Sequence, residues 1–377
     1  MELAEALLGG RRGRRALLEF ALESEAVLLQ GQTEHPLHGG LFDASYRVEA
    51  GRGDAVVLFG AGAGEGGKDV LTDEDIADLL AATQLVPVTF ERLRKALVRS
   101  VSTARYWQEP DGHDVIADAA PVRAGLVRVA DHIVASGQAA GWMSPAEPSR
   151  QWRVEWEQKD APGLWTLGGE PAAAVLASWR EAMGNAERRA AIDRPADPRA
   201  AWGGEWWSIP PASLVHSTGV FGDGSPVGLW CVEDGFGWDR AETRAVAVPG
   251  SARIFEVAGA SDWARLCRRY PLEVTAQKRH DWYRTTGRAG RWVMPDFSLV
   301  AREYDAVHLT TAAYLATAGE IIEVDSEGAS VVAGWNPDET YWFTDGVRLR
   351  SDPVAWACAD ANSGDAAWSR RRKGPED

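Results

Sequence analysis

The spacing of apolar residues changes along this chain, and the change restricts the folds open to it. Up to about residue 140, apolar side chains recur at steps of three and four, the pattern of a buried helix face. Two such sets are Phe90, Leu93, Leu97 and Val101, and Val122, Leu126, Val129 and Ile133. From Leu214 onward, short strand-forming runs alternate with turns. The pattern predicts an α+β protein, with a helix-rich N-terminal part and a mostly antiparallel C-terminal sheet with short helices.

Local patterns place individual elements. A small strand pair is predicted at residues 45–48 and 55–59, inside the helical part. An antiparallel meander is predicted at residues 214–221, 227–233, 244–248 and 253–257. Ser261 and Asp296 are predicted to cap two short helices. Later strands are predicted at residues 306–310, 320–324, 329–335 and 340–343.

Two proline-containing stretches divide the chain. Residues 143–149 hold two prolines, and residues 192–211 hold four prolines and two glycines, which is typical of boundaries and ordered loops. We therefore expect a helix-dominated domain, a helical linker region, a Trp-rich α+β domain with the active site, and a flexible tail. Their bounds are residues 1–145, 146–201, 202–361 and 362–377.

Charge and cysteine content exclude several classes of protein. The net charge of -15 argues against binding to nucleic acid or to anionic membranes, because a negative surface repels phosphate groups. The three cysteines are far apart in the sequence, which favours neither a zinc site nor a disulfide scaffold. Neither a signal peptide nor a membrane span is apparent, so a cytoplasmic location is expected. Motifs for metal ions and redox cofactors are missing, and we expect no cofactor.

A basic segment stands out from the acidic chain. Residues 265–291 carry eight basic and two acidic residues, a local charge of +6. Guanidinium groups bind phosphate, sulfate and carboxylate through paired hydrogen bonds, so Arg279, Arg284 and Arg291 are candidate ligands of an anionic substrate. His280 lies among them. The alternative is a solvated helix face and loop whose charges pair with acids elsewhere in the fold.

Tryptophan is the one compositional outlier, with 18 residues. Most of these indoles are expected in the core. Trp206 and Trp207 follow Trp202 in a short stretch flanked by glycine and proline, where three indoles are hard to bury together. We expect Trp206 or Trp207 to line a cavity and stack on the substrate.

Two histidines are candidate acids or bases. Strand alternation puts His216 and Thr218 on one face, and His308 follows Asp305 in another predicted strand. If the two strands are neighbours, two imidazoles and a carboxylate converge. A structural role is the alternative for each histidine. Glu339 follows the turn Asn336-Pro337-Asp338 and is a candidate general base, with turn chemistry alone as its alternative.

The run His216-Ser217-Thr218, with Glu339 far downstream, resembles the His-x-Thr and the late catalytic glutamate of one class of ADP-ribosyltransferases. The resemblance implies NAD as substrate, with His216 and Glu339 in the site. It covers three residues, and the aromatic pair that the class carries between them is not placed in this sequence. The function that it implies is therefore kept as an alternative.

A glycine-rich run at residues 60–68 fits both GxGxxG and GxxxxGK, which are patterns of phosphate-binding loops. Asp69 stands where a serine or threonine would hold magnesium, and no βαβ unit is predicted around the run. A connector loop is the favoured interpretation.

The leading hypothesis is a metal-independent transferase or lyase of small-molecule metabolism that acts on a small anionic metabolite. In this scheme the arginines hold the anion and His216 or His308 moves a proton. The first alternative is an NAD-consuming ADP-ribosyl or glycosyl transferase. The second is a non-catalytic module that docks an acidic carrier protein or partner subunit through the basic segment.

Overall fold

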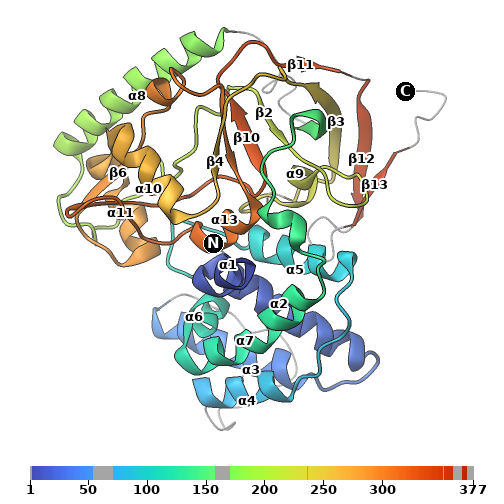
Figure 1. Cartoon of the computed structure of the whole chain (residues 1–377). Helices are drawn as coiled ribbons and strands as arrows, with labels where there is room; N and C mark the ends of the chain where they lie inside the picture. Colours follow the sequence, from blue (N-terminus) through green and yellow to red (C-terminus); the bar gives the residue numbers. More distant parts are fainter. Residues whose placement is uncertain are drawn as a thin grey trace.

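The computed structural model describes residues 2–53, 71–157, 170–235, 237–350, 352–359 and 367–371. Within these ranges the chain is an α+β protein, with helices in the N-terminal part and a large sheet in the C-terminal part (Figure 1). The fold class predicted from the apolar spacing is therefore confirmed. The glycine-rich run at residues 60–68 and the predicted strand at residues 55–59 lie outside the described residues.

The N-terminal helices bury the faces that their apolar spacing predicts. On α5 (Phe90–Ser102) the face of Leu93, Leu97 and Val101 is buried, and the Thr89 side chain caps the helix by accepting from Arg92 N. On α7 (Ala120–Ala135) the whole predicted face is buried. The other helices here are α1 (Leu3–Gly9), α2 (Arg11–Leu28), α3 (Pro36–Gly51), α4 (Asp73–Ala82) and α6 (Gly112–Asp118).

The predicted strand at residues 45–48 is wrong, because these residues belong to helix α3. Proline at the first turn and the carboxylate of Glu25, which accepts from the backbone N–H of Leu37 and His38, stabilise the start of α3. Leu37 and Leu41 then bury one helix face. The strand prediction rests on residues 45–48 alone, whereas the residues that bury the helix face come before residue 45.

One sheet of nine strands dominates the described C-terminal residues. Its order is β13-β12-β3-β1-β2-β10-β7-β4, with β11 paired to β3, and the β4–β7 pair alone among these is parallel. The strands are β1 (Gln151–Trp156), β2 (His216–Thr218), β3 (Arg240–Ala247), β4 (Ile254–Val257), β7 (Ala306–Leu309), β10 (Glu339–Trp342), β11 (Arg348–Leu349), β12 (Val354–Ala359) and β13 (Ala367–Arg370).

The predicted meander is wrong in its connections. Residues 227–230 form the short helix α9 (Val227–Trp230) instead of a strand. Gly228 N donates to Thr218 Oγ1, so α9 packs onto the end of β2. The neighbours of β2 are β1 and β10, which come from distant parts of the chain.

A smaller sheet and several short helices lie beside the large sheet (Figure 1). The strand order is β5-β6-β9-β8, with β8 (Ile322–Glu323) and β9 (Gly328–Ser330) as a shorter version of the predicted pair. Asp296 caps α12 (Phe297–Val300) as predicted, whereas α10 (Ala260–Arg269) begins after Gly259 and Ser261 lies within it. The remaining elements here are β5 (Pro271–Glu273), β6 (Arg291–Pro295) and α11 (Thr275–Thr286).

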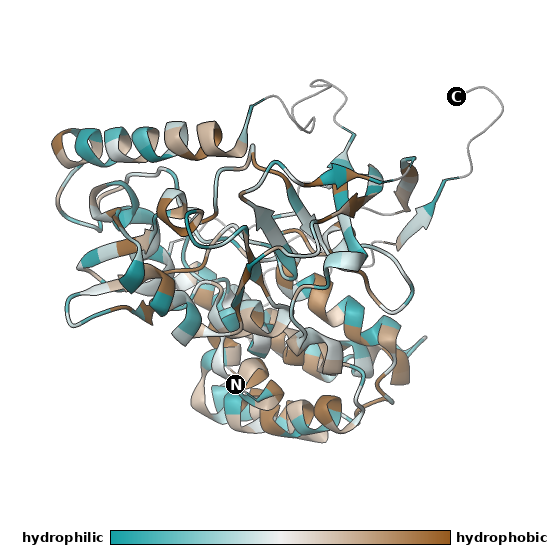
Figure 2. Ribbon diagram, turned by 45° about the horizontal axis from the view of Figure 1, so that its top comes forward, coloured by the Kyte–Doolittle hydropathy of each residue, from teal (hydrophilic) through white to brown (hydrophobic). Residues whose placement is uncertain are grey.

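The remaining described elements are one long helix, one edge strand and two 3-10 turns. The helix α8 (Ala172–Asp193) lies on the outside, where hydrophilic and hydrophobic residues alternate along it (Figure 2). Residues 367–370, expected within a flexible tail, form β13 and pair with β12. The two 3-10 turns are η1 (Ala140–Met143) and η2 (Pro148–Arg150). Among the described helices, each is too short or too polar to pass through a bilayer.

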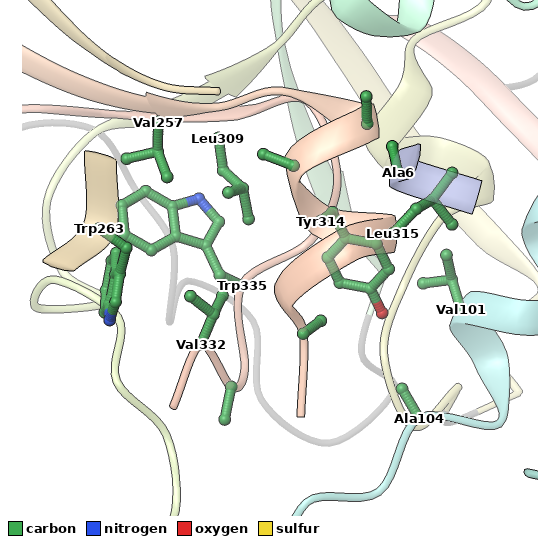
Figure 3. Packing of buried hydrophobic residues seen from close by; sticks show 14 of the residues in the cluster. Ala6, Val101, Ala104, Val257, Trp263, Leu309, Tyr314, Leu315, Val332 and Trp335 are labelled. Carbon is green, nitrogen blue, oxygen red and sulfur yellow. The ribbon is translucent and has the colours of Figure 1, made fainter. Parts of the chain in front are cut away.

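Helix α13 (Thr311–Thr317) joins the N-terminal helices to the sheet. It packs against α1 and α2, and Leu315 lies beside Ala6 while Tyr314 of the same helix lies between Leu315 and Trp335 (Figure 3). These residues belong to one hydrophobic cluster that runs from the N-terminal helices into the C-terminal part. The domain bounds at residues 145, 201 and 361 stay a prediction.

The shared core predicts a large effect of truncation on α13. Leu315 is fully buried, so Leu315→Ala should lower the free energy of unfolding by about 2–5 kcal/mol, measured by urea denaturation. Ile192 is 83% exposed, and Ile192→Ala is the matched control, with an expected change within about 0.5 kcal/mol. Equal effects of the two substitutions would contradict the shared core.

Candidate functional site

His216 and Glu339 stand on neighbouring strands and contact each other. The register of β2 and β10 places His216 opposite Tyr341 and Thr218 opposite Glu339. Nδ1 of His216 lies 2.6 Å from Oε1 of Glu339, a hydrogen bond in which the imidazole N–H donates to the carboxylate. Sequence spacing singled out both residues, and the structure brings them together.

The Glu339 carboxylate is held from two sides. While Oε1 accepts from His216, Oε2 accepts from the backbone N of Asn336 at 3.2 Å and from its side-chain Nδ2 at 3.4 Å. The ring of Tyr341 stacks on the imidazole of His216, with centroids 5.3 Å apart and planes at 14°. The turn before β10 therefore orients the Glu339 carboxylate. Glu339 can take part both in the turn and in a functional site.

The His216–Glu339 pair lines a small cavity of about 40 Å³. Trp152, Trp156 and Thr218 also line it. Trp156 in turn stacks on Trp238, with ring centroids 4.7 Å apart and planes at 17°. A space of this size admits one or two water molecules or a hydroxyl group.

Sequence reasoning missed Trp152, Trp156 and Asn336 as site residues. A signal for the tryptophans is present, because Trp152, Val154 and Trp156 alternate along β1 and share one face. The sequence predicts only a turn at Asn336, and the side-chain amide gains a second role through its contact with Glu339.

His308 forms a second histidine–carboxylate group. Its Nδ1 lies 2.6 Å from Glu256 Oε2, and its Nε2 lies 3.3 Å from Asp338 Oδ1. The other oxygen of Asp338 accepts from Gly219 N at 2.8 Å. Burial alone lowers the pKa of His308, but the hydrogen bonds and charges of Asp338 and Glu256 outweigh it and raise the pKa to about 9.

The expected convergence of His216, His308 and Asp305 is wrong. The strands β2 and β7 lie on either side of β10 and do not pair with each other. His216 is opposite Tyr341 and His308 is opposite Thr340, so the two imidazoles lie on opposite faces of the sheet. Asp305 instead accepts from Arg253 N at 2.8 Å, at the far end of β7.

Glu233 adds a buried carboxyl group beside this site. Its Oε2 accepts from Gly334 N at 2.7 Å, and its backbone N donates to Asn336 Oδ1 at 3.0 Å. Burial raises the pKa of Glu233 to about 8. The carboxyl group is therefore largely uncharged at neutral pH, and Asn336 connects the backbone of Glu233 to the Glu339 carboxylate.

The basic segment does not form the expected anion site. Arg279 donates to the carbonyls of Ala276 and Ala196, and His280 Nδ1 lies 3.3 Å from the carbonyl of Pro198. The segment therefore binds residues 196–207, a stretch without regular structure whose carbonyls need donors.

The other arginines of this segment are also occupied. Arg284 donates to the carbonyls of Trp107 and Trp202 and to the carboxylate of Asp281. Arg291 lies 2.9 Å from Glu273 and 3.1 Å from Asp325. The prediction that these guanidinium groups meet in an open positive hollow is corrected, because carbonyls and carboxylates already satisfy them.

Trp206 and Trp207 are not among the described residues that line the cavity beside Glu339. The ring of Trp206 packs against Tyr106 and Trp107, with the Trp107 centroid at 5.1 Å. Trp207 is 38% exposed. The tryptophans at the candidate site come from β1 instead.

Comparison of the chain with known protein families, with curated proteins and with solved structures found no match.

The His308 group predicts a pH dependence of stability. The pKa of His308 is raised from 6.5 to about 9 in the folded chain, so its stabilising contribution is complete below pH 6.5 and is lost as the pH rises toward 9. His308→Gln should remove a fall of the order of 3 kcal/mol in the free energy of unfolding over this interval, measured by urea denaturation.

The control for this experiment is the exposed His38, for which His38→Gln should keep the wild-type pH dependence. Glu233 lowers stability in the same direction from pH 4.5 to about 8, so the comparison of variant with wild type isolates His308. An unchanged pH dependence in His308→Gln would show that the imidazole is not charged in the folded chain.

Proposed function

We propose that the chain cleaves the N-glycosidic bond of NAD and transfers the ADP-ribosyl group to water or to another acceptor. The observation that carries the proposal is the 2.6 Å contact between His216 and Glu339 at a tryptophan-lined cavity. The sequence resemblance to one class of ADP-ribosyltransferases includes the same two residues.

The carboxylate of Glu339 supplies the electrostatics of such a reaction. Breaking the bond between the ribose carbon C1 and the nicotinamide nitrogen leaves the electron pair on that nitrogen, which neutralises the pyridinium ring. Positive charge then develops on the ribose, and a fixed carboxylate stabilises it. The oxygen of water or of another acceptor forms the new bond to C1, and its proton passes to the Glu339 carboxylate. His216 and Asn336 hold the Glu339 carboxylate in one orientation before the substrate arrives.

The residues that line the cavity can bind the other parts of the substrate. Trp152 and Trp156 line the cavity with apolar surface, and a nicotinamide or adenine ring stacks at its mouth, because the space itself admits only water or a hydroxyl group. The cavity of about 40 Å³ accommodates the attacking water or a ribose hydroxyl, and the body of the dinucleotide lies along its mouth. Thr218 lies at the same wall.

The hypothesis of an anionic metabolite held by Arg279, Arg284 and Arg291 has less support, because these guanidinium groups have partners within the chain. The same contacts weaken docking of an acidic protein through the segment. We also propose a cytoplasmic location, because Cys231 and Cys267 are buried thiols that form no disulfide, and a reducing compartment keeps thiols in this state.

The test is release of nicotinamide from NAD by the purified full chain, quantified by liquid chromatography. The wild type should release nicotinamide, and Glu339→Gln should be slower by about a hundredfold or more, because it removes the charge while keeping the shape. His216→Gln should also be slower, because it removes one of the two groups that orient Glu339.

Glu327→Gln is the matched control, since this glutamate is exposed and is not at the cavity. It should keep the wild-type rate, and thermal unfolding should show that all variants are folded. A folded wild type that releases no nicotinamide, or a Glu339→Gln variant with the wild-type rate, would refute the proposal.

A further inference from the structure

A second and larger cavity lies between the N-terminal helices and the end of the sheet. Its volume is about 540 Å³, within the usual range of small-molecule sites. The N-terminal side comes from α5 and η1, and the C-terminal side comes from the chain after β2, the start of α9 and Asp338. Rings of Phe90, Trp142 and Phe221 form part of its wall.

The charges in this cavity disfavour an anionic ligand. Arg94 is the only cation among its described lining residues, and it forms an ion pair with Asp223 at 2.5 Å. The Arg94 guanidinium also lies over the ring of Trp230, 3.7 Å from its centroid. With Arg94 paired to Asp223, Asp338 is the remaining charged residue of the lining. It belongs to a group of two carboxylates, Asp338 and Glu256, around the single imidazole of His308, and this group is net negative.

Asp338 is held in an unusual conformation at the cavity wall. Its φ of 59° lies in the left-handed region that non-glycine residues rarely adopt. Its Oδ2 accepts from Gly219 N at 2.8 Å, and a Cβ at position 219 would lie 2.6 Å from this oxygen. Glycine at 219 therefore permits the contact. His308 Nε2 lies 3.3 Å from Oδ1, and Thr218 Oγ1 lies 3.4 Å from Oδ2. A carboxylate has about four acceptor positions, so Asp338 has one left for a donor from the cavity.

We propose that this cavity binds an aromatic amine, with its ring between the aromatic walls and its ammonium group directed to Asp338. Aromatic faces attract both flat rings and cations, and the carboxylate adds a charge-assisted hydrogen bond. The hydroxyl of Thr311, also at the wall, is a further partner for the ligand.

The cavity is separate from the one beside Glu339. Thr218 lines the smaller cavity, and its Oγ1 lies 3.4 Å from Oδ2 of Asp338, which lines the larger one. The two sites are therefore adjacent, but the binding of an aromatic amine does not rest on NAD cleavage.

The experiment compares two probes on one ring system, tryptamine and indole-3-propionate, by isothermal titration calorimetry on the full chain. Tryptamine should bind saturably, and indole-3-propionate should bind at least about tenfold more weakly, because its carboxylate meets Asp338. Asp338→Asn should weaken tryptamine binding by about tenfold or more.

A second variant keeps the test decisive if Asp338→Asn does not fold. Gly141 lines the cavity and has no atom within 4 Å of the position of a Cβ, so Gly141→Phe should fill the cavity and abolish tryptamine binding. Gly39 has the same free space and lies on the surface of α3, and Gly39→Phe should bind like the wild type.

Three results would overturn the proposal: no saturable binding of tryptamine, equal binding of the two probes, or wild-type binding by Gly141→Phe. Glu339→Gln separates this proposal from the proposed function, because it should lose nicotinamide release and keep tryptamine binding.

Discussion

Two adjacent carboxylates at the start of β10, each fixed by a histidine, are the constraint on which both candidate sites depend. Glu339 is held by His216 from β2, and Asp338 is held by His308 from β7. His216 lies opposite Tyr341 and His308 lies opposite Thr340, so the two imidazoles approach these carboxylates from opposite faces of the sheet. The left-handed conformation of Asp338 is the local strain that this arrangement requires.

The N-terminal helices contribute to the sites as well as to stability. Through α13 they share the hydrophobic core of the C-terminal part. Phe90 and Arg94 of α5 then form one side of the larger cavity, so this cavity exists only where the two parts meet. An ion pair also joins the two parts, because Arg14 of α2 pairs with Glu320 just beyond α13. The helical part is therefore a structural component of the functional region.

The sequence predicted those features that depend on local spacing. The buried faces of α5 and α7, the strand that holds His308 and the placement of Glu339 after a turn all follow from patterns within a few residues. The pairing of β2 with β10 joins residues more than a hundred positions apart, and no local pattern encodes it. For the same reason Glu256 and Asp338, and not Asp305, are the partners of His308.

The basic segment shows a different limit. The segment has a net charge of +6, but a count of charges along the sequence does not show which backbone carbonyls accept hydrogen bonds from its arginines. Arg284 alone donates to two carbonyls from distant segments. By contrast, the alternation of Trp152 and Trp156 along the sequence predicts that both side chains share one face of a strand. In the structure this face lines the cavity beside Glu339.

His216 and His308 bind different carboxylates, and their imidazoles lie on opposite faces of the sheet. Proton NMR of the ring N–H groups in histidine-labelled protein can detect both contacts, because a ring proton bound to a carboxylate gives a separate downfield signal. Both histidines should give such a signal, and Glu339→Gln should remove the His216 signal and keep the His308 signal. An unchanged spectrum in Glu339→Gln, or loss of both signals, would show that the two histidines do not bind separate carboxylates.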